Sequence, residues 1–407
     1  QQKSDVILDT KLTWADLERN LKSALKTEAV FGPNKSVTDI GEGNGFVSRC
    51  GMVVCDWVND EGLEKLPSRI VIKIPSVAPF RKLNDSLPKG QRMLEGGEEL
   101  WALMEGKLRE AHDIEVATYE FFEAFNDLSV PVMYYGVMFG REDTDNGQIC
   151  LELVENSKMM RYHENHTVEQ VRQIVRALGK IQACSLKKEL TATELQRNFF
   201  EEFAKTVTLE GNRGNFKALL TLDSSEKTAK LWEEIDKLLP EYYAASLPTT
   251  IHAQLGFRPV LVNGDLRTEN VLIHADSGDL SAFIDWQTAH LGVGVEDLIR
   301  ITLFALTAEE RRASASMLVA EMYDCLVQNL DGTEPPYTLE VLRELYDLLF
   351  PHCAFFFAGP CIMLITNQAS DPKLSAAEKE RRKEVELVKV LASLEDAVEY
   401  DAKNKQS

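Results

Sequence analysis

Residues 263–287 read NGDLRTENVLIHADSGDLSAFIDWQ. Within this stretch the turn-forming residues DSGD separate two β-like runs, VLIH and SAFI. Asp, Ser and Gly favour tight turns for different local reasons, and runs of this kind on either side of them are typical of paired strands. The stretch therefore predicts a β-hairpin with a two-residue loop at Ser277-Gly278.

The register of this hairpin predicts that oxygen-bearing side chains meet at its open end. If Asp276 faces Asp279, counting outward from the loop places Asn270 opposite Asp285. Asp265 arrives at the same end from the preceding loop. Mg²⁺ prefers oxygen ligands and is bound through one or two carboxylates together with substrate phosphates. The arrangement favours a metal-nucleotide site over the simpler alternative, a turn with local Asp and Asn caps.

The chain around the hairpin is long enough for two domains, because it has 407 residues of which 44% are hydrophobic. Strand signals occupy residues 36–75 and 131–154, and a helical pattern lies between them at 98–125. Helical patterns dominate after Asn156, beginning clearly with a capping box at Thr167.

These patterns predict an α+β protein of two lobes. The N-terminal lobe, residues 1–155, is expected to be small and mostly β, and the C-terminal lobe, residues 156–407, larger and mostly α. The charged tail after Pro372 predicts an amphipathic packing helix.

Charge and cysteine usage limit the partners of the chain. The chain has 45 Lys and Arg residues and 65 Asp and Glu residues. The resulting net charge of −20 argues against nucleic acid or an anionic membrane as partners. The seven cysteines are scattered and form no C-x-x-C pair, which fits a reducing compartment. No signal-peptide core and no run of eighteen apolar residues is found, so a soluble cytoplasmic protein is expected.

A glycine-rich segment, Gly41-Glu42-Gly43-Asn44-Gly45, precedes the strand-like run FVSRCGMVV. Glycines let backbone N–H groups approach phosphate closely, although a plain hairpin turn has the same composition. A dinucleotide-binding fingerprint is excluded, since that motif opens a helix and this one opens a strand.

A lysine in the next strand-like run needs an anionic partner. In IVIKI the alternation of a strand places Lys73 and Val71 on one face and the isoleucines on the other. Glu115 lies on a largely apolar stripe of the helical segment 98–125, which predicts an inward-facing carboxylate. Buried charges persist when they are paired, so an ion pair between Lys73 and Glu115 is expected. The alternatives are a snorkelling edge lysine and an exposed glutamate.

Together these features resemble the aminoglycoside phosphotransferase and choline kinase superfamily, and most closely its ecdysteroid-kinase-like (CHK kinase-like) branch, over residues from about Gly41 to Leu298. The resemblance implies a bilobal protein-kinase-like fold that uses ATP and Mg²⁺. It implies that Asp265 is the catalytic base and that Asn270 and Asp285 hold magnesium.

The resemblance also assigns nucleotide-binding residues. Lys73 and Glu115 would position the α and β phosphates, with Val71 beside Lys73 on the strand. Gly41, Gly43, Asn44 and Gly45 would cover the phosphates, and Glu152, Leu153 and Val154, in CLELVEN, would lie near the adenine.

Two positions depart from the family pattern. The histidine that usually precedes Gly-Asp is Asn263, and the tryptophan that commonly follows Asp-Leu is Arg267. The histidine usually braces the catalytic loop against the metal-binding segment. The region where such families build their acceptor pocket, between Lys187 and Pro259, carries no recognisable motif, so the acceptor is not identified.

The function expected from the sequence is an ATP-dependent kinase acting on a hydroxyl of a small metabolite, such as a steroid-like or other lipophilic compound. The alternative is a pseudokinase-like binding protein, which the Asn263 departure favours. A protein kinase is disfavoured because GVGVEDLIRI follows Asp285 where an activation segment ending in A-P-E would be expected. The oligomeric state is not predicted.

Overall fold

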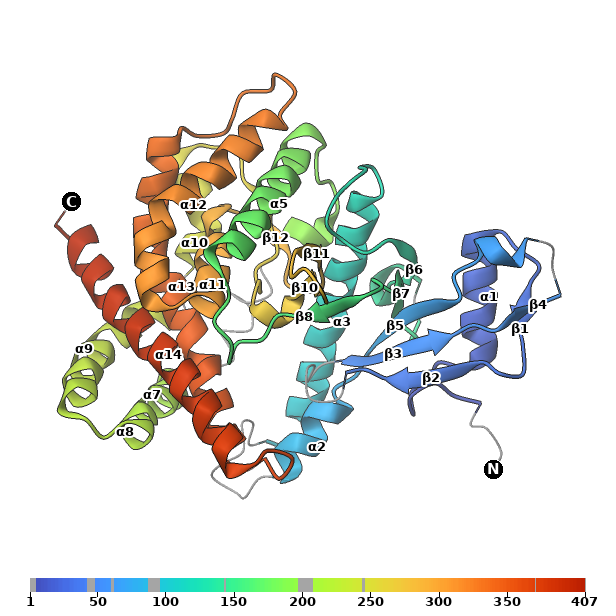
Figure 1. The fold of residues 1–407 in the computed structure, drawn as a ribbon, viewed down its shortest axis with the longest axis horizontal. Coiled ribbons are helices and arrows are strands. Elements are labelled where there is room, and N and C mark those ends of the chain that lie inside the picture. Colours follow the sequence, from blue (N-terminus) through green and yellow to red (C-terminus); the bar gives the residue numbers. More distant parts are fainter. Residues whose placement is uncertain are drawn as a thin grey trace. The chain divides into compact units, whose positions relative to one another are not determined.

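The computed structural model describes residues 5–41, 48–59, 62–86, 96–142, 144–196, 208–243, 246–369 and 371–406. The chain divides into two compact units, which are coloured by sequence in Figure 1. The first contains Gln1–Asn126 and Val130–Glu155, and the second contains Asp127–Ser129 and Asn156–Ser407. The chain thus passes from the first unit to the second between Glu155 and Asn156.

The N-terminal unit is built on an antiparallel five-stranded sheet in the order β2-β3-β5-β7-β6. Its strands are β2 Ser36–Asp39, β3 Ser48–Val54, β5 Arg69–Pro75, β6 Met133–Val137 and β7 Gln148–Glu152. The short strands β1 Val30–Phe31 and β4 Trp57–Val58 pair separately. Its helices are α1 Trp14–Leu25, α2 Ala78–Ser86, α3 Glu98–Phe122 and α4 Phe139–Glu142, with a 3-10 turn at Leu63–Lys65.

The alternation of β5 separates the two faces of this sheet. Ile70, Ile72 and Ile74 are buried in a core that also contains Leu17 and Leu21 of α1. Successive strand residues point to opposite faces, so Lys73 lies on the other face. That is the face on which α3 supplies its ion-pair partner. The predicted division of this strand into an isoleucine face and a lysine face is confirmed.

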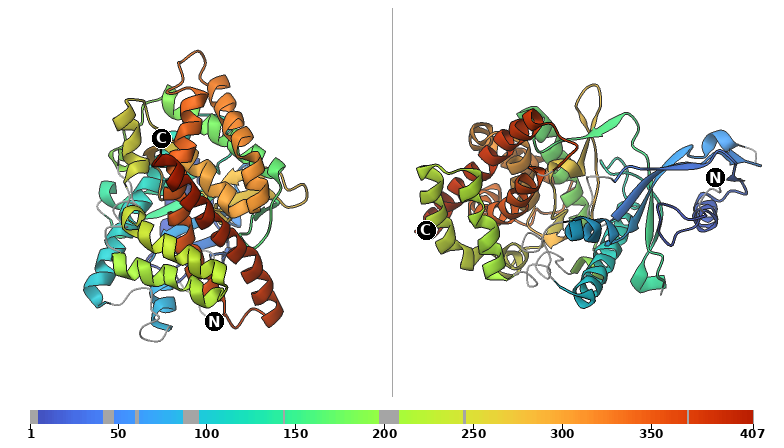
Figure 2. Two further views of the ribbon diagram at one scale, coloured as in Figure 1. Left: turned by 90° about the vertical axis from the view of Figure 1, so that its left-hand side faces the viewer. Right: turned by 90° about the horizontal axis from the view of Figure 1, so that it is seen from below.

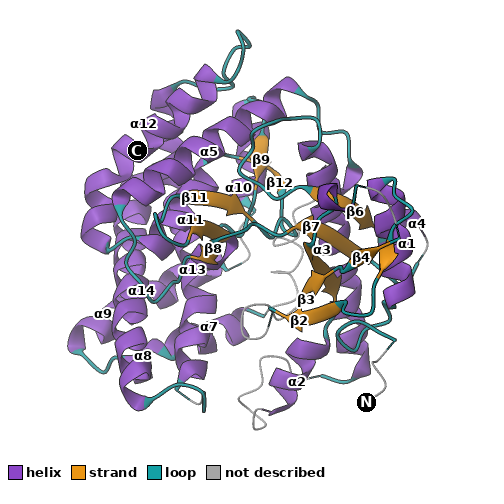
Figure 3. Cartoon of the chain, turned by 45° about the vertical axis from the view of Figure 1, so that its right-hand side comes forward, coloured by secondary structure: helices purple, strands orange, loops and turns teal. Residues whose placement is uncertain are grey.

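The C-terminal unit is mainly helical, as the purple ribbons of Figure 3 show. Its helices are α5 Val168–Lys187, α7 Leu209–Lys217, α8 Leu219–Leu222, α9 Glu226–Tyr242, α10 Leu247–Leu255, α11 Val295–Ala305, α12 Ala308–Gln328, α13 Leu339–Gln368 and α14 Ala376–Asn404, with 3-10 turns at Thr193–Gln196 and Thr268–Asn270. Its strands are β8 Ser157–Met159, β9 Val260–Val262, β10 Val271–His274, β11 Leu280–Phe283 and β12 His290–Gly292. The predicted α+β class is confirmed.

Local sequence signals fix several of these helices. Thr167 caps α5 through a capping box with Gln170, as predicted. The charged tail forms α14, which packs along α13, and the two helices lie side by side at the red end of the colour scale in Figure 2. Among the described helices, α13 is long and apolar enough to cross a membrane by length and composition, and 67% of its most apolar window is buried inside the protein.

The predicted hairpin forms, but its register is wrong. β10 pairs antiparallel with β11 through Val271 and Phe283, with a shift after Leu272. The N–H of Gly278 donates to the carbonyl of His274, so the connection is longer than two residues.

The shift changes which residues face each other at the open end. Asp276 binds the side chain of Asn156 and does not pair with Asp279. The backbone of Asn270 consequently pairs with Ile284, whose N–H donates to it at 3.0 Å, and Asp285 lies one residue further along.

Candidate functional site

The first part of the predicted site is an ion pair inside the N-terminal unit. Lys73 Nζ lies 2.7 Å from Glu115 Oε2, and the two side chains are 11% and 1% exposed. The expected pair between β5 and α3 is therefore confirmed as a contact. A buried charge without a partner would be costly, so each residue stabilises the charged form of the other in this position.

His112 on α3 is a buried neighbour of this pair. Burial lowers the pKa of His112 to about 4, partly opposed by its hydrogen bond with the Val137 carbonyl, and the charge of Lys73 lowers it further. The imidazole is therefore neutral near pH 7. Lys73 consequently keeps the only positive charge of the three residues Lys73, His112 and Glu115.

The glycine-rich segment is described only at its first residue. Gly41 follows β2, and its N–H donates to Asp39 Oδ1 at 2.9 Å. A Cβ placed on Gly41 would come within 3.3 Å of the backbone nitrogen of Cys50, so glycine permits the close approach to β3. Gly43, Asn44 and Gly45 lie outside the described residues.

The remaining predicted nucleotide residues lie on the sheet or at its end. Val71 is half-buried on β5. Glu152 ends β7 and accepts a hydrogen bond from Val132 N–H, and the half-buried Leu153 and Val154 follow it. Their predicted role beside the adenine stays a prediction.

The second part of the site lies in the C-terminal unit, where side-chain amides join the three predicted catalytic and metal residues. Asn270 Nδ2 donates to the carbonyl of Asp265 at 2.8 Å. Asn263 Oδ1 accepts from the N–H of Asp265 at 3.1 Å, and Asn263 Nδ2 donates to the carbonyl of Asp285 at 3.1 Å. Asn263 is fully buried and links the predicted base to the predicted metal ligand.

The backbone of this segment is held in unusual conformations. Gly264 has a φ of +84°, and a Cβ at this position would lie 2.5 Å from the Thr288 carbonyl. Asp285 has a φ of +62°, a value that few residues with a side chain adopt. Strained backbone that the surrounding structure maintains is found preferentially at functional sites.

The electrostatics of the segment are dominated by acids. Burial raises the pKa of Asp265, the guanidinium of Arg267 partly offsets this effect, and the charge of Asp285 raises the pKa again. The Asp265 side chain remains 26% exposed. A carboxylate in this position can accept a proton more readily than an ordinary aspartate.

The donor set fits a magnesium ion that is completed by phosphates. Asp285 offers a carboxylate, and Asn270, whose Nδ2 is engaged by Asp265, offers Oδ1. In the part of the chain that the structure describes, no group of three or more His, Cys, Asp or Glu could hold a metal. A magnesium ion that is bound together with a nucleotide typically has only one or two protein ligands.

Asp297 is a functional candidate that the sequence analysis missed. Its carboxylate, on the first turn of α11, accepts the N–H groups of Asn263 at 2.7 Å and Gly264 at 3.0 Å. Burial raises the pKa of Asp297 to about 6, although these two donors oppose the rise. A signal existed in the acidic pair of GVGVEDLIRI, at the start of a mostly apolar helix.

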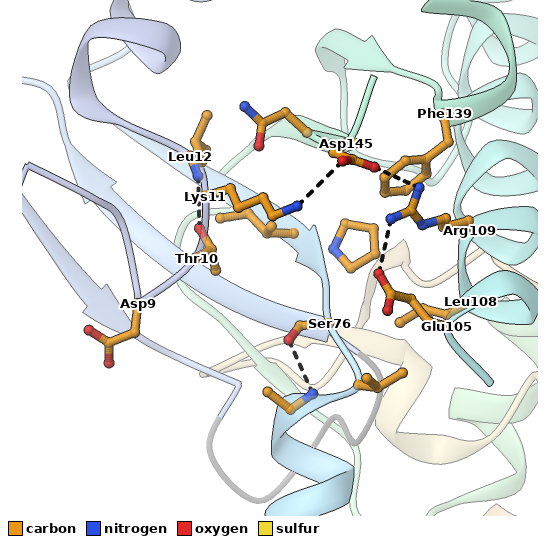
Figure 4. Close-up of a pocket in the computed structure, with 16 residues that line it drawn as sticks. Asp9, Thr10, Lys11, Leu12, Ser76, Glu105, Leu108, Arg109, Phe139 and Asp145 are labelled. Carbon is orange, nitrogen blue, oxygen red and sulfur yellow. Dashed lines mark hydrogen bonds and ion pairs between the residues drawn. The ribbon is translucent and has the colours of Figure 1, made fainter. Parts of the chain in front are cut away.

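A cavity of about 380 Å³ in the N-terminal unit contains none of the predicted site residues (Figure 4). Asp145 lies at its polar side, paired with Lys11 at 3.5 Å and Arg109 at 2.9 Å. Leu108 and Phe139 contribute apolar lining. Glu105 also pairs with Arg109, at 3.0 Å, so the two basic residues of the cavity lining are both engaged in ion pairs.

A family model matches residues 1–405, almost the whole chain. The chain belongs to the DUF1679 family. This family is described as "Uncharacterized oxidoreductase dhs-27". A dinucleotide-binding oxidoreductase fold is built on parallel strands, whereas the strands paired in the described residues are antiparallel.

Other similar proteins carry kinase names. The Caenorhabditis elegans "Uncharacterized kinase-like protein D1044.1" is 22% identical over 370 residues, which cover 89% of this chain and 93% of that protein. A putative aminoglycoside phosphotransferase from Ralstonia eutropha is 12% identical, with a TM-score of 0.46 and coverage of 95% and 98%. A choline kinase from Cryptosporidium parvum is also 12% identical, with a TM-score of 0.46 and coverage of 91% and 89%.

Proposed function

We propose that this DUF1679 protein is an ATP-dependent kinase that transfers the γ-phosphoryl group of ATP to a hydroxyl of a small molecule. The observation that carries the proposal is the hydrogen-bonded set of Asp265, Asn270 and Asp285, held together through Asn263. The buried Lys73–Glu115 pair supports it independently.

The chemistry assigns different roles to these residues. The acceptor hydroxyl would donate its proton to Asp265 while its oxygen forms a bond to the γ-phosphorus, and the bond to the β,γ-bridging oxygen breaks to release ADP. The Asp265 carboxylate accepts no hydrogen bond from a described residue, so its oxygens can receive that hydroxyl.

The remaining residues would bind and orient the nucleotide. Lys73, held by Glu115, would bind the α and β phosphates. Asn270 and Asp285 would hold magnesium, which when bound neutralises phosphate charge. Placement in the ecdysteroid-kinase-like branch, a lipophilic acceptor and a cytoplasmic location are parts of the same proposal, the last supported by seven cysteines that are scattered along the sequence without a C-x-x-C pair.

A pseudokinase-like protein that binds nucleotide without turnover is the second candidate. The observation in its favour is that Asn263 and Arg267 occupy positions where the similar family usually has histidine and tryptophan. Asn263 nevertheless makes the bracing contact to Asp285, which favours a working catalytic loop.

An ATP-consumption screen over hydroxylated small molecules tests the proposal, run beside binding measurements with Mg-ATP. The kinase account expects consumption that depends on one class of hydroxyl compound and is lost in Asp265→Asn. Binding of Mg-ATP without turnover on any compound would favour the pseudokinase, and the absence of both would remove the two candidates together.

A further inference from the structure

Arg267 is a charged residue of the catalytic segment for which the mechanism above has no role. It lies two residues after Asp265, and its backbone N–H donates to the Asp265 carbonyl at 2.8 Å. Its side chain is only 25% exposed. The short backbone turn therefore keeps the guanidinium beside the predicted base.

The guanidinium of Arg267 lies near acidic side chains, but its Nε donates no hydrogen bond to them. Arg267 Nε lies 3.8 Å from Asp265 Oδ2, beyond hydrogen-bond distance. Nε is buried, and no described residue accepts a hydrogen bond from it. Buried polar atoms are normally satisfied, so a buried arginine nitrogen in this state requires an explanation.

The charges around Arg267 keep it ionised. Burial lowers the pKa of Arg267, and the carboxylates of Asp265, Glu269 and Asp285 outweigh that effect and raise it. The side chain is thus a permanent cation that the protein places among three acids. Arginine is suited to phosphate because its planar set of donors matches two phosphate oxygens at once.

We propose that Arg267 binds the phosphoryl group that is transferred, with its guanidinium donating to non-bridging oxygens of the γ-phosphate. The proposal rests on the proposed kinase function. The group touched is the one that moves from ATP to the acceptor held by Asp265, so Arg267 would be a catalytic residue rather than only a partner of Asp265. Negative charge on the transferring group would be stabilised by this contact.

Two other roles make different predictions. If Arg267 only compensates the charge of Asp265, its removal alters the pH dependence of turnover and leaves nucleotide affinity unchanged. If it holds an anionic group of the acceptor, nucleotide affinity is again unchanged. Only contact with the γ-phosphate predicts that removing Arg267 lowers the affinity for a nucleoside triphosphate and not for the diphosphate.

Calorimetric titration of the full chain separates these roles. The probes are magnesium complexes of ADP and of the β,γ-imido analogue of ATP, which avoids turnover. The proteins are the wild type, Arg267→Gln and Arg267→Lys. Arg172→Gln is the matched control, because Arg172 makes a surface ion pair with Glu321 in the same unit.

The expected result is a loss of about tenfold or more in affinity of Arg267→Gln for the triphosphate analogue, with ADP affinity changed by less than about twofold. Arg267→Lys should lie between Arg267→Gln and the wild type, because it keeps the charge but not the paired donors. The control should match the wild type, and unfolding temperatures would show that each variant is folded.

The proposal is overturned if both nucleotides weaken equally or neither changes, in Arg267→Gln or, should that variant not fold, in Arg267→Lys. A wild type that binds ADP and the analogue but never turns over an acceptor would reject the kinase and still report on the contact. A wild type that binds neither nucleotide would reject the kinase and the contact together.

Discussion

The two parts of the candidate site differ in how their charges are compensated. In the N-terminal unit, Lys73 and Glu115 form a neutral pair in direct contact, and both are almost fully buried. In the C-terminal unit, burial and the charge of Asp285 raise the pKa of Asp265, and the guanidinium of Arg267 only partly offsets the rise. One part is complete within the protein, and the other retains excess negative charge.

This difference indicates how each part would be used. A paired lysine is held in one position before a ligand arrives, which limits the entropy lost when phosphate binds. An acidic segment with few protein ligands is instead completed by a divalent cation and its phosphates. Changes in the first part should therefore affect folding as well as phosphate binding, and changes in the second should mainly affect ligand binding and chemistry.

The largest expected effect follows from Asp265→Asn. An amide cannot accept the proton of the acceptor hydroxyl, so turnover should fall by about 10² to 10⁴, the usual range for a positioned base. Affinity for Mg-ATP should barely change, because the base acts mainly in the transition state. A turnover assay beside calorimetry measures both quantities, and Asp331→Asn, at an exposed position in the same unit, is the control. Loss of nucleotide affinity in Asp265→Asn would mean that the role is misassigned.

The next largest effect concerns folding of the N-terminal part. Glu115→Gln leaves Lys73 without its carboxylate, and Lys73→Met leaves Glu115 without its ammonium group, so each should lower the free energy of unfolding by about 3–5 kcal/mol. The double variant should cost less than the sum, with a coupling of about 0.5–3 kcal/mol. Denaturant unfolding measures all three.

The exposed pair Glu120–Arg141 is a matched control, because Glu120 lies on the same helix and its side chain is 39% exposed. Its removal should cost about 0–1 kcal/mol. Full additivity of Lys73→Met and Glu115→Gln would contradict the account of a coupled pair.

A smaller effect is expected for Asp285→Asn. This change removes a charge from the predicted metal ligands, so Mg-ATP affinity and turnover should fall together, by about tenfold or 1.4 kcal/mol at least. Calorimetry with Mg-ATP, and with ATP in the presence of a chelator, isolates the metal-dependent part. Unchanged Mg-ATP affinity would remove Asp285 from the metal site.

The smallest effect is expected for Asn263→His. A histidine could still donate to the Asp285 carbonyl, so nucleotide affinity should be unchanged and turnover should change by less than about tenfold. Kinetics with any substrate found in the screen checks this. An increase of orders of magnitude would show that the wild-type loop is degraded and would favour the pseudokinase.

Local signals were sufficient for much of the fold and for one part of the site. The capping box at Thr167 predicted the start of α5, and the alternation of IVIKI predicted the two faces of β5 and the pairing of Lys73. These features depend on residues close in sequence or on a strong energetic demand, such as the pairing of a buried charge.

Features set by tertiary contacts could not be predicted in the same way. The observed register differs from the prediction, and it is accompanied by a hydrogen bond between Asp276 and Asn156, a residue far away in the sequence, and by closure of the connection through Gly278. The contacts of Asp297 with the predicted catalytic loop depend on how α11 packs against that loop, and the acidic pair in GVGVEDLIRI marks Asp297 without showing which segment it contacts. The resemblance gave position 263 as a brace of this loop, but the atoms through which the Asn263 amide joins Asp265 and Asp285 were visible only in three dimensions.

Thermal unfolding of the wild type with Mg-ATP tests the central claim most directly. A ligand bound only by the folded state should add about 2.7 kcal/mol at a free concentration of a hundred times Kd. The account predicts a rise in unfolding temperature with Mg-ATP that a magnesium chelator largely abolishes. No shift at millimolar Mg-ATP would contradict both the kinase and the nucleotide-binding alternative.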